Sequence, residues 1–135
     1  RVLRLLLAGP TETRGEASRQ AALDDVLAAL AHFAAIGASE DIAQTLTILG
    51  DCYSARLDAD ADRLALHQYA QAIAVASSVT PTPTFCLGII HRSCANHHRR
   101  RARPDAALEE FTEARRCLLH SPDARMGTLL AGLLV

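Results

Sequence analysis

The sequence predicts an all-α protein made of antiparallel helix pairs, and three observations support this prediction. Hydrophobic residues make up 50% of the chain and aromatic residues only 4%, so its apolar content is mostly Ala, Leu, Ile and Val. Ala and Leu are strong helix formers. The apolar residues recur at steps of three and four, and glycines and prolines divide the chain into segments of helical length.

The first three helices are expected in the N-terminal half. We predict the first over residues 17–36, because its apolar residues fall on one helix face. Gly37 ends it, since glycine readily adopts the left-handed conformation that follows many helices. The second helix is predicted over residues 40–57, with two acids in its first turn, and the third over 62–78. The acidic segment 58–62 connects these two helices.

Prolines mark the boundaries of the remaining helices. Pro81 and Pro83 cannot lie inside a helix, and they separate the third helix from a fourth over residues 84–101. The fifth helix is predicted over residues 104–119 and a sixth over 122–135, each with a proline at its first turn. The turns between successive helices are short, which favours antiparallel neighbours.

Two segments repeat one pattern at a distance of 42 residues. Residues 65–72 (ALHQYAQA) and 107–114 (ALEEFTEA) both read Ala-Leu-x-x-aromatic-x-x-Ala, and a small residue precedes each. The pattern resembles the tetratricopeptide repeat, a helix pair in which small residues let helix A and helix B approach closely. The matching residues are Leu46, Leu49, Gly50, Tyr53, Ala65, Tyr69 and Ala72 in one unit, and Ala95, Ala107, Phe111 and Ala114 in the next.

This resemblance implies an architecture. Helix pairs of this kind stack into a right-handed superhelix, because one pair cannot bury its apolar face alone and neighbouring pairs share a core. We therefore expect one domain over residues 1–135, with units at about 1–37, 38–80 and 81–120 and a partial unit at 121–135. The long period is similar to that of units found in large bacterial regulators. Two departures stand out: a longer turn before Ala65, and polar or small residues at His91, Cys94 and His98.

The same resemblance implies a binding surface. In this family the A helices line a concave groove that usually holds a peptide, so we expect a non-catalytic peptide- or protein-binding module, part of a bacterial regulator. Arg92 and Arg99 would hold acidic groups and Asn96 the peptide backbone. The expected binding residues are Arg92, Asn96, Arg99 and Arg100 from one A helix, and Gln44, Thr47, Asp51 and Ser54 from the preceding one. An alternative is that the Arg run is a solvated helix end.

A metal site is a further interpretation. His91, Cys94 and His98 share one helix face and are residue types that bind zinc, with Cys86 available as a fourth ligand. The repeat pattern places them against helix B, which favours packed core residues, so we predict no metal and no cofactor. The acidic segment 58–62 lacks the glycine and glutamate of a calcium loop. Nothing marks an orienting group or an oxyanion hole beside the Cys–His set, so we expect no enzyme.

Charge and composition limit the partners. The formal net charge is −1, and no aromatic residue interleaves the basic run at 97–103, so a nucleic-acid partner is not expected. No apolar run reaches the length of a membrane helix and no signal peptide is visible, so we expect a cytoplasmic protein with reduced thiols. All fourteen basic residues are Arg, which indicates a GC-rich, bacterial source.

Two remaining features are the opposite charges of the two parts of the chain and its apolar tail. Residues 1–80 carry a charge of −4 and residues 81–135 a charge of +3, which would orient a polar, acidic ligand or neighbouring repeats. The apolar tail at 127–135 favours an alternative function, a structural segment that forms a homodimer or packs on flanking domains of the same chain.

Overall fold

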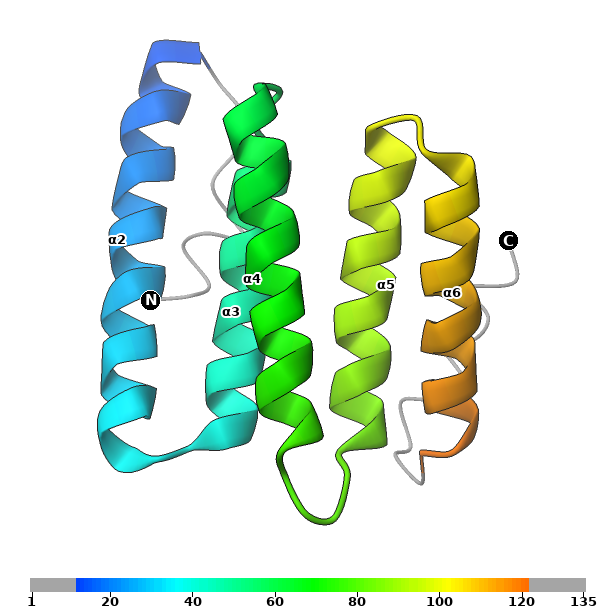
Figure 1. Ribbon diagram of the computed structural model, residues 1–135. Helices are drawn as coiled ribbons and strands as arrows, with labels where there is room; N and C mark the ends of the chain where they lie inside the picture. The colour runs from blue at the N-terminus through cyan, green and yellow to red at the C-terminus, as the bar shows by residue number, and fades with distance from the viewer. Residues whose placement is uncertain (1–11, 122–135) are drawn as a thin grey trace.

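The computed structural model describes residues 12–121, and within this range all regular structure is helical (Figure 1). The helices are α2 (Glu12–Ile36), α3 (Ser39–Ser54), α4 (Ala59–Ser77), α5 (Thr84–Arg100) and α6 (Pro104–Leu119). Helices that follow one another in the chain run antiparallel, and the predicted all-α class is confirmed. None of these described helices is long and apolar enough to cross a membrane. The predicted sixth helix and the apolar tail lie outside the described residues.

The helix boundaries follow local signals. Gly37 ends α2 with a φ of 69°, in the left-handed region that glycine adopts at little cost. Asp58 caps α4, because its carboxylate accepts a hydrogen bond from the backbone N–H of Ala61 at 2.8 Å. The acidic segment 58–62 is therefore the N-cap and first turn of α4, and this helix begins three residues earlier than predicted, at Ala59. Helix α3 also ends three residues earlier than predicted, at Ser54.

The helices pack as two close pairs, α3 with α4 and α5 with α6, while α2 lies against α3. One apolar cluster joins the two pairs. Its buried members are Ala43 and Leu46 of α3, Ala72 and Ala76 of α4, Cys86, Leu87 and Ile90 of α5, and Cys117 of α6. Because both pairs contribute to one core, neither buries its apolar face alone.

Small residues permit the close approach within each pair. A Cβ atom added at Gly50 would lie 2.6 Å from the ring of the buried Tyr69, so α3 and α4 approach at this glycine as the repeat pattern implied. In the second pair a Cβ at Gly88 would lie 2.7 Å from the side chain of Leu118. The sequence pattern named Ala95 for this pair; Ala95 is buried, and Gly88 is an additional close contact that the pattern did not reveal.

Candidate functional site

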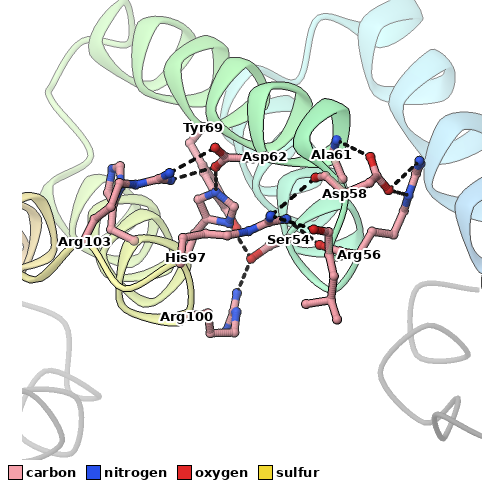
Figure 2. Close-up of polar contacts among 12 residues, drawn as sticks. Ser54, Arg56, Asp58, Ala61, Asp62, Tyr69, His97, Arg100 and Arg103 are labelled. Atoms are coloured by element: carbon pink, nitrogen blue, oxygen red, sulfur yellow. Dashed lines mark hydrogen bonds and ion pairs between the residues drawn. The ribbon is translucent and has the colours of Figure 1, made fainter.

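A polar network lies where the C-terminal end of α5 meets the turn between α3 and α4 (Figure 2). His97 is at its centre and is fully buried. Its Nδ1 lies 2.7 Å from the hydroxyl of Ser54, and its Nε2 lies 2.6 Å from Oδ1 of Asp62. We call Ser54, Asp62, His97, Arg100 and Arg103 the His97 network.

Two arginines complete the His97 network. Arg103 donates to both carboxylate oxygens of Asp62, at 2.7 and 3.0 Å, and Arg100 donates to the hydroxyl of Ser54. The hydrogen bonds from Arg103, followed by the bond from His97, lower the pKa of Asp62 well below its usual value. Asp62 is therefore ionised near neutral pH.

The protonation of His97 follows from its partners. Burial lowers the pKa of His97, so the ring is neutral near pH 7. Because Nε2 faces an ionised carboxylate, we assign the ring proton to Nε2, which donates to Asp62. Nδ1 then accepts the hydroxyl proton of Ser54, whose oxygen accepts from Arg100.

This arrangement has the contacts of a serine–histidine–carboxylate relay. Ser54 is 3% exposed and His97 0% exposed, so no substrate reaches the hydroxyl in this conformation. Arg103 also neutralises the carboxylate that would have to stabilise a charged imidazole. We therefore interpret the His97 network as a connection between the two helix pairs.

Arg101 strengthens the same connection from outside. Its guanidinium donates to the backbone carbonyl oxygens of Leu57 at 3.2 Å and Asp58 at 3.3 Å, and to that of Arg56. These carbonyls belong to the turn that follows α3. The end of α5 thus holds the α3–α4 turn through charged groups and neutral backbone oxygens together.

The sequence singled out Ser54 and Arg100 of this network as binding residues, but not the contacts that join them to the other members. Asp62 belongs to the acidic segment 58–62, and His97 and Arg103 belong to the basic run at 97–103. The available signal was the acidic segment 58–62 and the basic run at 97–103, two opposite charges at helix ends. That signal does not reveal which charges meet, because the partners are 35 to 46 residues apart.

A second group of polar residues joins α3 to α4 and α5. Tyr69 donates a hydrogen bond of 2.5 Å to Asp51. Withdrawal of this carboxyl from water raises the pKa of Asp51, while the bond from Tyr69 and the charges of Arg100 and Arg92 act in the opposite direction. The predicted binding residues Asp51, Arg92 and Arg100 therefore lie within electrostatic range of each other.

The predicted binding residues also differ in burial. Thr47 and Ser54 are buried with their hydroxyls engaged, Thr47 by the carbonyl of Ala43 at 2.8 Å and Ser54 in the His97 network. The remaining side chains are at least partly open to solvent and make no hydrogen bond or ion pair with any residue in 12–121. They are Gln44, Arg92, Asn96 and Arg99.

The predicted metal ligands His91, Cys94 and His98 have different contacts. The Nδ1 of His91 pairs with Glu110 at 2.6 Å, and the Nδ1 of His98 accepts from Arg103 at 3.0 Å. Cys94 packs in an apolar cluster with Ala65 and Tyr69. The three side chains therefore contact different partners.

A different set of metal-ligating residues comes together among residues 12–121. One ligand atom each from His91, Glu113 and Cys117 lies within 4.8 Å of the other two. His91 belongs to α5 and the two others to α6. Only His91 was among the residues that the sequence suggested.

Comparison with known proteins gives no assignment. No protein-family model matches the chain, and no curated protein and no solved structure is significantly similar to it.

Proposed function

We propose that the chain is a non-catalytic peptide- or protein-binding helical-repeat module of the tetratricopeptide type. The proposed binding surface is formed by α3 and α5, which would be the A helices of successive units, and its partner would be an acidic, extended segment. A role within a larger bacterial regulator rests on the resemblance in repeat length.

The observation that carries the proposal is the row of unpaired polar side chains on α5. Arg92, Asn96 and Arg99 follow at steps of four and three, so they share one helix face. Their side chains make no hydrogen bond or ion pair with another residue in the described part of the chain, and the charge of Arg92 acts on Asp51 from a distance. Guanidinium groups without a hydrogen-bonded partner are available to bind carboxylates in two-point contacts.

The spacing of these groups suits an extended ligand. Seven residues of helix separate Arg92 from Arg99, which is about 10 Å along the axis. A peptide in the polyproline II conformation advances about 3.1 Å per residue with three residues per turn, so acidic residues three positions apart lie on one side of it and would face both arginines. Asn96 lies between them, and its amide would pair with the backbone of the ligand.

The surrounding structure makes this face rigid. The His97 network and the contacts of Arg101 fix the end of α5 relative to α3, and α3 contacts α5 directly. Side chains on a fixed backbone lose less entropy when a ligand binds, which increases affinity. Asp51, held by Tyr69, places one negative charge near the arginines and would disfavour ligands that carry acids at every position.

A peptide-array experiment tests the proposal. Peptides with two Asp or Glu residues three positions apart are compared with the same peptides carrying Asn or Gln, using the chain and the variant R92A/R99A. We expect binding of the acidic peptides to fall about tenfold or more for each lost charged contact. The matched control is R115A, which removes an exposed arginine of α6. Equal binding by the double variant, or equal binding of amide peptides, would place the function elsewhere.

A structural, self-associating role is the second candidate, and exposed apolar residues on the two outermost described helices favour it. Leu108 and Leu119 of α6 are 66% and 54% exposed, and Ile36 at the end of α2 is 62% exposed. Such side chains would be covered by another repeat or another copy. Light scattering across protein concentration, with L108Q as the variant, separates this role from monomeric peptide binding.

A further inference from the structure

We propose that His91, Glu113 and Cys117 form a zinc site between α5 and α6. Glu113 and Cys117 are four residues apart on α6, so they lie on the same helix face, and that face meets His91 of α5. The site goes beyond peptide binding and uses no residue of the proposed binding surface.

The distances fit a tetrahedral ion after a small adjustment. The three ligand atoms lie within 4.8 Å of one another. Zinc bonds of about 2.0–2.3 Å place tetrahedral ligand atoms about 3.3–3.8 Å apart. The set therefore has to contract by at most about 1.5 Å, which side-chain rotations on two packed helices supply.

Glu110 supports the site from one turn earlier on α6. Its carboxylate lies 2.6 Å from Nδ1 of His91. If zinc takes Nε2, Glu110 orients the ring and raises its basicity, which is the usual arrangement around a metal-bound histidine. If zinc takes Nδ1 instead, the Glu110 oxygen is close enough to join as an oxygen ligand. The carboxylate assists metal binding in both cases.

The donor set selects the metal. One imidazole nitrogen, one thiolate sulfur and one carboxylate oxygen make a mixed set that suits zinc, whereas calcium and magnesium prefer oxygen ligands alone. Cys117 is 3% exposed, and burial raises the pKa of its thiol. Binding therefore replaces the thiol proton with the zinc–sulfur bond, and one proton is released to solvent.

Arg116 is the competing group. It donates to both carboxylate oxygens of Glu113, and one of its nitrogens lies 3.9 Å from the sulfur of Cys117. The Arg116 side chain is 61% exposed, so it can turn into solvent when zinc takes its place. We expect R116A to bind zinc more tightly than the unmodified chain.

The experiment uses the full 135-residue chain under reducing conditions. Zinc is titrated calorimetrically in two buffers of different protonation enthalpy, which counts the released proton, and cobalt(II) is titrated optically. The proposal predicts one ion per chain, about one proton released, a thiolate-to-cobalt charge-transfer band, and a higher melting temperature with zinc.

Matched variants locate the ligands. C117A is compared with C94A, since both cysteines are buried on neighbouring helices, and E113Q is compared with E109Q. We expect C117A to lose the cobalt band and E113Q to bind at least tenfold more weakly, whereas C94A and E109Q bind as the unmodified chain does. Circular dichroism confirms that each variant is folded.

The opposite results would overturn the proposal. They are zinc binding weaker than about 100 μM, an unchanged cobalt band in C117A, or loss of the band in C94A, which would assign the metal to the His91, Cys94 and His98 set. None of these outcomes depends on peptide binding, so the zinc site and the proposed binding surface are tested separately.

Discussion

Replacement of His97 by Ala is expected to destabilise the protein strongly, because this residue connects the two helix pairs. The change removes a fully buried ring, its contact with Ser54 at 2.7 Å and its contact with Asp62 at 2.6 Å. Truncation of a large buried side chain costs about 2–5 kcal/mol, and a hydrogen bond to a charged group contributes about 1.5–3 kcal/mol. Arg103 and Arg100 remain as partners of Asp62 and Ser54, which limits the loss.

We therefore expect the free energy of unfolding to fall by about 3–5 kcal/mol, out of a total of about 5–15 kcal/mol for a domain of this size. At about 4 °C per kcal/mol, the melting temperature would fall by about 12–20 °C. Urea unfolding followed by circular dichroism measures the first value, and calorimetry the second. The control is H67A, which changes an exposed histidine of α4 and should cost less than about 0.5 kcal/mol.

The size of the effect discriminates between two descriptions of the network. A loss below about 1 kcal/mol in H97A would mean that the buried contacts do not hold the pairs together, and the reasoning would be refuted. A double-mutant cycle with D62A adds a second check. We expect a coupling energy of about 1–3 kcal/mol between the two positions. Additive effects would show that the contact between His97 and Asp62 does not contribute to the free energy of unfolding.

Three further predictions follow from the same contacts. Because burial lowers the pKa of His97 in the folded state, the stability that depends on its neutral form is present above about pH 6.5 and is lost as the pH falls through the folded-state value. Urea midpoints measured from pH 8 to pH 5 should therefore decline, and the decline should be smaller in H97Q. A Cβ atom at Gly50 would lie 2.6 Å from the ring of the buried Tyr69, so G50A should lose about 1–3 kcal/mol in urea unfolding. An equal stability of G50A and the unmodified chain would contradict this close approach. Removal of the hydroxyl in Y69F leaves the ring in place and loses the 2.5 Å bond to Asp51, so the free energy of unfolding should fall by about 1 kcal/mol, and a stability increase would show that this bond is not favourable.

The helices and their turns were predictable because their signals are local. Gly37, Pro81 and Pro83 act on the backbone of adjacent residues, so the ends of α2 and α4 could be assigned from the sequence. The boundary between α3 and α4 was less accurate. There, Arg101, the residue that follows α5, donates to the backbone oxygens of the turn, and no residue near the turn indicates a partner more than forty positions away.

The repeat pattern marked Gly50 as a small residue where two helices approach closely, but it did not name Tyr69 as its partner. The pattern did not indicate the close contact between Gly88 and Leu118, because neither residue belongs to the repeated motif. Likewise, the helix face that holds His91, Cys94 and His98 was correctly identified as a packed face, while the partners of these side chains were not visible.

The sequence by itself determined the helical class, the number and approximate ends of the helices over residues 12–121, and the row of polar residues Arg92, Asn96 and Arg99 on one face. These properties depend on the 3.6-residue period and on backbone preferences, which act within a few positions. Only the tertiary structure decided that His97 contacts Ser54 and Asp62, and that His91 meets Glu113 and Cys117. Such contacts between side chains depend on the rotation and axial shift of one helix against another. Those two quantities are fixed by how the whole set of buried side chains interlocks, and no local pattern encodes them.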